Sequence, residues 1–336
     1  MDKVRVGING MGRIGRAFLR QSVDDPDLEV VAVNDVIGAS ALARLLRRDS
    51  TWGPFRVPVD GDADVLLVGD VKVAVSSMSQ PERVPWLSHD VDLVIEATGK
   101  FRTREAAAGH LGAGAGRVLL SAPGKGVDAT LVMGVNEQTF DPDRHRVVSN
   151  ASCTTNCVAP MVKVLHDAFG FAQGFMTTVH AYTSDQNILD GPHKDPRRAR
   201  AAAVNIVPTS TGAAKAVGEV LPALAGRLDG VALRVPVVDG SLVDLAAVLE
   251  RDVTRQEVNE AFAAASAAGP LAGRLRYETE PLVSSDVILD PASCVFDAAL
   301  TQASGRLVKT FGWYDNEWGY TARLLEMATL VGRGSR

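Results

Sequence analysis

Apolar strand-like runs alternate with amphipathic helical stretches along the first half of the chain. The predicted strands are Val4–Ile8, Glu29–Val33, Val91–Glu96, Arg117–Ser121 and Leu131–Val135, and the predicted helices are Arg13–Asp24, Ala39–Arg48 and Glu105–Leu111. Strands that alternate with helices in this way predict a parallel sheet covered by helices. Alternating Val and Leu residues over Val57–Val75 predict a small antiparallel addition to it.

The pattern changes after residue 150. A long predicted helix, Cys153–Phe169, precedes a series of strand-like runs with two further helices between them. The runs are Gln173–Tyr182, Val231–Val235, Leu242–Glu250, Cys294–Thr301 and Leu307–Tyr314, and the helices are Gly212–Leu224 and Thr254–Ala267, the second opening with a Thr254…Glu257 capping box. Strands in succession predict a mostly antiparallel sheet with helices on one face.

The two patterns together predict an α/β chain of two domains, which suits a length of 336 residues. Residues 1–150 form a Rossmann-type domain with a parallel sheet, and residues 151–318 form an α+β catalytic domain with a mostly antiparallel sheet. The C-terminal segment, residues 319–336, begins with the amphipathic run Gly319–Val331. We expect this helix to pack back on the first domain.

Composition narrows the range of partners and compartments. An apolar fraction of 46% and a net charge of −5 fit a globular protein without the basic face of a nucleic-acid binder. Three cysteines do not make a disulfide framework, so we expect a reducing, cytoplasmic environment. No apolar run reaches membrane-spanning length, and Val4–Ile8 follows the first residues too closely for a signal peptide.

A glycine-rich turn after the first strand predicts a dinucleotide site. Gly10, Gly12 and Gly15 allow a tight turn and the close approach of a pyrophosphate, which the N-terminus of the next helix attracts. Asp35 ends the second strand, 20 residues beyond Gly15, where a carboxylate accepts hydrogen bonds from ribose hydroxyls. Because the same carboxylate repels a 2′-phosphate, the sequence favours NAD over NADP. The alternative is a glycine-rich turn in an unrelated α/β domain.

Cys153 lies where an extended segment ends and a helical pattern begins. A helix N-terminus stabilises a thiolate, so we expect a lowered pKa and a nucleophilic sulfur. The alternative is a small buried hydrophobic residue, which suits Cys157 better. A metal site at Cys153 and Cys157 lacks two further ligands, so we expect no metal. His180, on a strand-like run, is the candidate base, although a lone histidine of this kind is more often part of a core.

Polar and cationic residues follow His180. The long loop Ala181–Ala203 contains Thr183 and Arg198, and Thr211-Gly212 and Arg234 come later at a helix start and on a strand. Part of this charge is a solvated surface. Hydroxyls at helix starts together with guanidinium groups are also what phosphate binding requires, so the sequence predicts two anion subsites.

The motifs together resemble phosphorylating glyceraldehyde-3-phosphate dehydrogenase, essentially from end to end. The resemblance rests on Asn9–Arg16, Ala151–Cys157, His180–Thr183, Pro192–Asp195, Arg197–Ala203, Pro208–Lys215 and Trp313–Tyr320. It implies that Cys153 attacks the aldehyde of glyceraldehyde 3-phosphate and that His180 is the base. It also implies a thioester that inorganic phosphate cleaves to 1,3-bisphosphoglycerate, and a homotetramer in which the loop Ala181–Ala203 reaches a neighbouring subunit's cofactor.

The resemblance assigns further binding residues. The substrate phosphate would contact Thr183 and Arg234, inorganic phosphate would contact Ser152, Thr154, Thr211 and Gly212, and Arg198 would lie close to both. NAD would contact Asn9, Gly10, Gly12, Arg13, Ile14, Gly15, Asp35, Thr98, Gly99, Ser121, Asn316 and Tyr320. Of these, Asn316 would orient the nicotinamide amide, with Tyr320 near the same end.

Three segments depart from the common family pattern: Ser79-Gln80-Pro81 near the adenosine, Gly191 before Pro192, and Val237–Ser241 beside the substrate pocket. They raise the hypothesis of a form altered in cofactor tolerance, including some use of NADP, or in sensitivity to thiol-directed inhibitors. Four alternatives stay open at this point: erythrose-4-phosphate dehydrogenase, an enzyme of the aspartate-semialdehyde dehydrogenase type, a Cys/His hydrolase, and a non-catalytic redox-sensing or binding protein.

Overall fold

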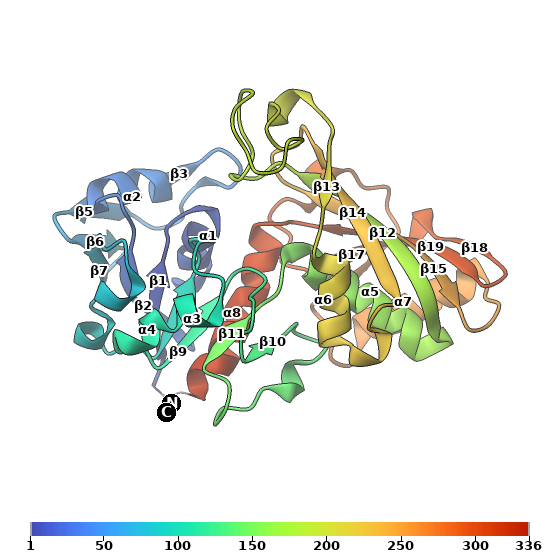
Figure 1. Ribbon diagram of the computed structural model, residues 1–336, viewed down its shortest axis with the longest axis horizontal. Coiled ribbons are helices and arrows are strands. Elements are labelled where there is room, and N and C mark those ends of the chain that lie inside the picture. Colours follow the sequence, from blue (N-terminus) through green and yellow to red (C-terminus); the bar gives the residue numbers. More distant parts are fainter. Residues whose placement is uncertain (1, 335–336) are drawn as a thin grey trace. The chain divides into compact units, whose positions relative to one another are not determined.

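The computed structural model describes residues 2–334, which form two compact units. The first contains the residues up to Leu131, Gln138–Ala151 and the chain from Thr321 onward. The second contains Val132–Glu137 and Ser152–Tyr320. Each unit is built on one large sheet (Figure 1).

The first unit carries a nine-stranded sheet in the order β10-β11-β9-β8-β1-β2-β7-β6-β5. Its strands are β1 (Val4–Asn9), β2 (Leu28–Asn34), β5 (Val59–Asp62), β6 (Val65–Val68), β7 (Val71–Ser76), β8 (Leu93–Glu96), β9 (Arg117–Leu120), β10 (Ala129–Thr130) and β11 (Val147–Ser149), and a separate hairpin joins β3 (Arg48–Asp49) to β4 (Gly53–Pro54). The pairing is parallel from β10 to β7 and antiparallel for β6 and β5. Strand order reverses between β1 and β8, and ligands of such sheets bind beyond the strand ends at that point.

The helices of the first unit are mostly short. They are α1 (Arg13–Ser22), α2 (Ala39–Arg47), α3 (Arg104–Ala107), α4 (Gly109–Gly112), the 3-10 turns η1 (Pro81–Arg83) and η2 (Trp86–His89), and α8 (Trp318–Arg333) from Thr321 onward, while η3 (Glu137–Thr139) spans the boundary between the units. The C-terminal end of α8 lies against β1, since a Cβ on Gly332 would come within 2.3 Å of the Val4 side chain. Arg333 also donates a hydrogen bond of 2.6 Å to Asp27.

The second unit carries an eight-stranded sheet in the order β13-β14-β12-β15-β19-β17-β16, with β18 paired to β19. Its strands are β12 (Phe171–Ala181), β13 (Val207–Ser210), β14 (Leu228–Val235), β15 (Ser241–Leu249), β16 (Leu275–Glu278), β17 (Cys294–Asp297), β18 (Gln302–Ser304) and β19 (Leu307–Tyr314). The pairing is antiparallel except between β12 and β14 and between β16 and β17. The parallel register of β12 and β14 sets His180 opposite Arg234.

Helices pack on this sheet. They are α5 (Cys153–Phe169), α6 (Ala213–Val220), α7 (Arg255–Ala267) and the 3-10 turns η4 (Ala202–Val204), η5 (Pro222–Leu224), η6 (Ser284–Val287) and η7 (Ala298–Leu300). The central helix α5 contacts β12, β15, β17 and β19 and also packs on α6 and α7. The predicted capping box of α7 is confirmed, because Glu257 N donates to Thr254 Oγ1 at 3.2 Å and Thr254 N donates to Glu257 Oε2 at 2.8 Å.

The predicted fold class is confirmed, with local errors. The strand predicted at Leu131–Val135 is wrong: Gly134 has a φ of +83°, and Val135 N bonds to the Val132 carbonyl at 3.0 Å in a turn. The helix predicted at Glu105–Leu111 is broken into α3 and α4, and Gly109, at the break, is a weak helix former. Among residues 2–334, no helix is long and apolar enough to cross a bilayer.

Candidate active site

The sulfur of Cys153 lies at the start of α5. Ser152 caps this helix, since its hydroxyl accepts the Thr155 N–H at 3.0 Å. Cys153 is therefore the first residue of the helix, directly after the turn that leads from the preceding strand, as the sequence predicts. Cys157 and Cys294 are buried, and all three cysteines are free thiols.

His180 contacts this thiol from β12. Its Nε2 is 3.4 Å from Cys153 Sγ, and its Nδ1 is 2.7 Å from the Ala181 carbonyl oxygen. A carbonyl accepts only, so Nδ1 carries the proton and Nε2 presents a lone pair to the thiol. The arrangement fits a general base aimed at a nucleophile.

Burial and charge shift both groups. Burial raises the pKa of the Cys153 thiol to about 11, and Arg234 and the N–H groups at the start of α5 offset only part of this. Burial, followed by the positive charge of Arg234, lowers the pKa of His180 to about 3. The lowered thiol pKa expected from the helix N-terminus is therefore wrong for the thiol alone, because desolvation is the larger effect. With these two shifts, the pair at neutral pH is a neutral thiol in contact with a neutral imidazole.

Arg234 links His180 to a polar cluster. Its Nη1 donates to the Ala181 carbonyl at 2.9 Å and to Thr183 Oγ1 at 3.0 Å, and lies 3.1 Å from His180 Nδ1. Its Nε is buried with no hydrogen-bond partner. A buried guanidinium N–H without a partner is costly, so this atom fits an anionic ligand.

The cluster continues toward Arg198. Asp185 bonds to both Thr183 and Arg198. Arg198 Nε donates to Thr209 Oγ1 at 3.0 Å. Thr183 and Asp185 thus connect Arg234 to Arg198. The sequence alone predicts no role for Asp185, because an aspartate in a loop gives no distinctive signal.

The other predicted phosphate residues are differently placed. Thr211 and Gly212 stand at the start of α6, where Thr211 Oγ1 accepts Ala213 N at 3.2 Å and a Cβ on Gly212 would meet nothing within 4 Å. The Thr154 hydroxyl turns inward and lies 2.9 Å from the Tyr314 hydroxyl, which is 2.8 Å from Thr178 Oγ1. Thr154 thus offers its backbone, rather than its side chain, to an anion.

Asn316 lies just after β19. It is buried, and its Oδ1 accepts a hydrogen bond of 2.6 Å from Ser241 Oγ, which in turn accepts Ala181 N at 3.1 Å. Tyr320 is also buried, in α8, and its N–H donates to the Asp315 carbonyl at 3.3 Å.

In the first unit, the predicted cofactor residues meet at the carboxyl ends of β1, β2 and β8. Gly10 has a φ of +94°, and a Cβ there would come within 2.8 Å of Thr98 N. A Cβ on Gly15 would lie 2.1 Å from the Gly10 carbonyl oxygen, so both glycines are sterically required. Asp35 closes the turn, since its Oδ2 accepts Met11 N at 2.7 Å.

The start of α1 can hold a pyrophosphate. No side chain caps this helix, and a Cβ on its N-cap residue, Gly12, would meet nothing within 4 Å. Arg13 and Ile14, which begin the helix, are partly exposed. Gly99 follows Thr98 with a φ of +69°, and Ser121 Oγ donates to the Glu96 carbonyl at 3.1 Å at the end of the next strand. An open, uncapped helix N-terminus beside the carboxylate of Asp35 fits NAD.

Comparisons with known proteins match both units. The family model described as "Glyceraldehyde 3-phosphate dehydrogenase, NAD binding domain" matches residues 4–104, and "Glyceraldehyde 3-phosphate dehydrogenase, C-terminal domain" matches residues 152–316. The chain is 55% identical over 328 residues to "Glyceraldehyde-3-phosphate dehydrogenase" of Kitasatospora aureofaciens, covering 97% of this chain and 98% of the relative. The chain belongs to the glyceraldehyde-3-phosphate dehydrogenase family. It is also 54% identical over 330 residues to "Glyceraldehyde-3-phosphate dehydrogenase 2" of Streptomyces arenae, covering 98% of each chain.

Family membership confirms the resemblance drawn from the motifs, and the matched family domain is one that binds NAD. Two of the predicted cofactor side chains are nevertheless engaged elsewhere. Asn9 is buried: its amide donates to Glu96 at 2.6 Å and accepts from Asn34 at 2.8 Å. The Arg13 guanidinium bonds to Asp49 and stacks over Trp52 at 3.8 Å. Any contact of these two residues with the dinucleotide would come from the backbone.

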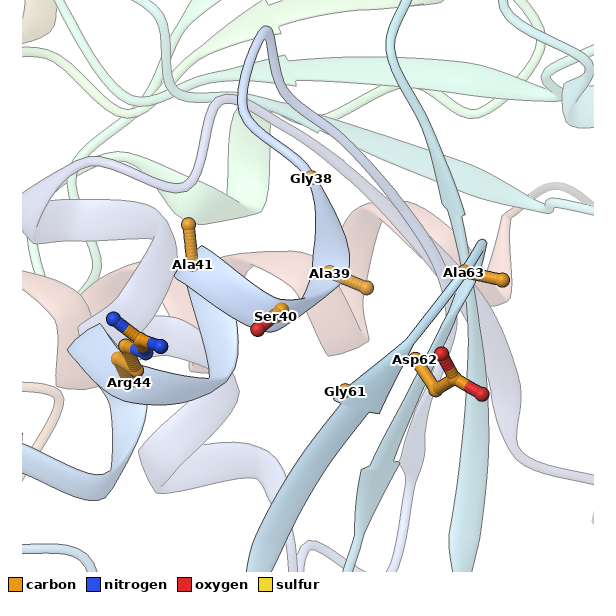
Figure 2. A pocket seen from close by; sticks show the side chains of 8 residues that line it. All are labelled: Gly38, Ala39, Ser40, Ala41, Arg44, Gly61, Asp62 and Ala63. Atoms are coloured by element: carbon orange, nitrogen blue, oxygen red, sulfur yellow. The ribbon is translucent and has the colours of Figure 1, made fainter.

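A cavity of about 550 Å³ lies elsewhere in the NAD-binding domain of this family member, between the start of α2 and the β5–β6 hairpin (Figure 2). Its lining residues are Gly38, Ala39, Ser40, Ala41, Arg44, Gly61, Asp62 and Ala63. None of them belongs to the predicted cofactor set. Within the described part of the chain, no cluster of three or more His, Cys, Asp or Glu side chains could hold a metal ion.

Proposed function

We propose that this chain catalyses the glycolytic oxidation of glyceraldehyde 3-phosphate to 1,3-bisphosphoglycerate, with NAD and inorganic phosphate. The observation that carries the proposal is the 3.4 Å contact between Cys153 Sγ and His180 Nε2, with Arg234 beside it. Family membership supports the same reaction.

Cys153 and His180 share the covalent step. The sulfur attacks the aldehyde carbon as its proton passes to His180 Nε2. The imidazolium then gives this proton to the former aldehyde oxygen, which yields a hemithioacetal and a neutral imidazole. His180 then accepts the hemithioacetal hydroxyl proton as the C–H bond breaks, and a thioester to Cys153 results. Bound NAD supplies the hydride acceptor for this oxidation. The backbone N–H groups at the start of α5 stabilise the negative charge on the former aldehyde oxygen while this oxygen lacks its proton.

Two groups of residues bind phosphate in this proposal. Arg234, through its unpartnered Nε, and Thr183 hold the phosphate of the substrate. The starts of α5 and α6, at Ser152 and at Thr211-Gly212, hold inorganic phosphate, which attacks the thioester and releases the thiol. In the proposal Arg198, which bonds to Asp185 and to Thr209, lies close to both phosphates.

In the proposal NAD contacts the segment Gly10–Gly15, Asp35, and the residues that follow β8 and β9, which are Thr98-Gly99 and Ser121. Asn316 orients the nicotinamide amide. The carboxylate of Asp35 accepts from ribose hydroxyls, which favours NAD over NADP. The first unit is thus the NAD-binding domain and the second the catalytic domain.

The proposed assembly is a homotetramer in the cytoplasm. Large apolar side chains are exposed on one face of the second sheet, with Phe175 72% and Leu307 53% exposed, and on the loop that contains Ile188, 86% exposed. Exposed apolar side chains on one face of a sheet are typical of subunit contacts. Light scattering coupled to size-exclusion chromatography tests this assembly.

Following NADH formation from glyceraldehyde 3-phosphate, with and without phosphate or arsenate and with NAD or NADP, tests the reaction. We expect turnover that requires phosphate or arsenate, prefers NAD and disappears in Cys153→Ser. Cys157→Ser, one helical turn further on, is the matched control and should keep activity. Turnover without phosphate would favour erythrose-4-phosphate dehydrogenase, and function unaffected in Cys153→Ser would favour a non-catalytic protein.

A further inference from the structure

Asp239 and Asp315 form a buried carboxyl pair in the second unit. Asp239 comes just before β15 and Asp315 just after β19, and these strand ends are adjacent because Ser241 pairs with Tyr314. Asp239 is 0% exposed and Asp315 1% exposed. Each carboxyl group shifts the pKa of the other, and a side-chain hydrogen bond between them is among the causes. Two ionised carboxylates cannot both persist at such a distance inside a protein.

Backbone donors decide which member of the pair is ionised. Asp315 accepts three N–H groups, from Glu317 at 2.8 Å, Trp318 at 2.6 Å and Leu289 at 2.8 Å. Asp239 accepts one, from Gly240 at 2.9 Å, and its Oδ2 is buried with no other donor. Three N–H groups stabilise an anion better than one, so Asp315 is the carboxylate and Asp239 Oδ2 carries the proton.

The surroundings reinforce this assignment. Burial, followed by the negative charges of Asp315 and Glu317, raises the pKa of Asp239 to about 8. The nearby segment η6 contributes another acid, Asp286, whose carboxylate accepts Val283 N at 2.8 Å. The backbone next to Asp239 is closely packed. Gly240 has a φ of +83°, and a Cβ there would lie 2.2 Å from the Ser284 carbonyl oxygen.

Both members of the pair lie on segments that hold Asn316 in place. Asp315 immediately precedes Asn316 and holds the turn that follows it through bonds to Glu317 N and Trp318 N. Ser241, two residues after Asp239, holds the Asn316 side chain at 2.6 Å. The position of the Asn316 amide therefore depends on the contact between the β14–β15 connection and the turn after β19.

We propose that Asp239 is a positioning residue for nicotinamide binding: its protonated carboxyl donates a hydrogen bond to Asp315 and so fixes the turn that carries Asn316. The inference rests on the proposed role of Asn316 toward NAD. Asp239 loses its proton as the pH rises past its raised pKa, two buried carboxylates then face each other, and the turn shifts. Affinity for the nicotinamide end falls with it, whereas contacts to the adenosine diphosphate part are unaffected.

Binding titrations with NAD and with ADP-ribose, which lacks the nicotinamide, test the proposal below and above a pH of about 8. For the wild type we expect NAD affinity to fall about tenfold across this range, the effect of one hydrogen bond to a charged group, with ADP-ribose unchanged. Asp239→Asn keeps a donor that does not titrate, so its NAD affinity should match the low-pH wild type throughout. Asp239→Ala lacks the donor and should bind NAD weakly at both values.

Carbon-13 NMR of labelled aspartate carboxyls gives a readout without cofactor. One carboxyl should titrate near pH 8 in the wild type and be missing in Asp239→Asn, whereas Asp167→Asn, at an exposed helix position, should keep it. Absence of that titration, or NAD affinities of wild type and Asp239→Asn that change equally with pH, overturns the inference. A wild type that shows the titration but binds neither NAD nor ADP-ribose refutes the proposed function, and the role of Asp239 toward nicotinamide with it.

Discussion

Replacing His180 by Asn tests whether Cys153 depends on a proton acceptor or on its own acidity. The thiol has a pKa of about 11, so at pH 7 only about one sulfur in 10⁴ is ionised without help. In the wild type the proton passes to His180 Nε2, 3.4 Å away, as the sulfur attacks, so the reacting pair holds the same number of protons as the resting thiol and neutral imidazole. Reactivity of the wild-type sulfur should therefore change little across neutral pH.

In His180→Asn the sulfur must ionise alone. Its rate of alkylation by iodoacetamide should then rise about tenfold per pH unit toward the thiol pKa of about 11. At pH 7, kcat/KM for glyceraldehyde 3-phosphate should fall by about 10²- to 10⁴-fold, or roughly 3–5 kcal/mol of transition-state stabilisation.

The assay is the pH dependence of alkylation and of NADH formation, measured on the same preparations. His89→Asn changes a histidine of the other unit and should behave as the wild type. A His180→Asn enzyme with a flat alkylation profile at the wild-type rate would refute the reasoning, because the imidazole would then contribute nothing to the nucleophile.

Three further predictions concern the binding groups. Gly12→Ala should fold normally but bind NAD weakly, because its Cβ occupies open space beside α1. Gly15→Ala should have a lower Tm, because its Cβ lies 2.1 Å from the Gly10 carbonyl oxygen. Equal Tm values for the two variants would contradict this. Arg234→Leu should lower kcat/KM for glyceraldehyde 3-phosphate by about 10- to 150-fold through loss of a charged hydrogen bond, with Arg234→Lys in between, and initial rates measure it. Asp35→Asn should weaken NAD binding and raise the NADP-to-NAD activity ratio because the repelling charge is gone; an unchanged ratio would count against its role.

The cofactor turn could be predicted because its parts are close in sequence. Gly10 and Gly12 lie in the turn after β1, Gly15 lies in the first turn of α1, and Asp35 directly follows β2, so the spacing alone implies a common edge. The start and end of α5 were likewise predictable, since Ser152 caps the helix and Gly170, with a φ of +72°, ends it. In contrast, the apolar run Leu131–Val135 looks like a strand, and only the turn at Gly134 removes it from the sheet.

Local patterns thus determined the two-sheet architecture, the glycine turn and the presence of a thiol at a helix start. Contacts between distant segments decided the chemistry of the site. The parallel register of β12 and β14 brings His180 beside Arg234, and the adjacent ends of β15 and β19 bring Asp239 to Asp315. Burial in this packed environment then raises the pKa of Cys153, whereas a helix N-terminus alone would lower it. The reason is physical: hydrophobic periodicity and turn residues act over a few neighbours along the chain, whereas desolvation and charge depend on everything that surrounds a group in space.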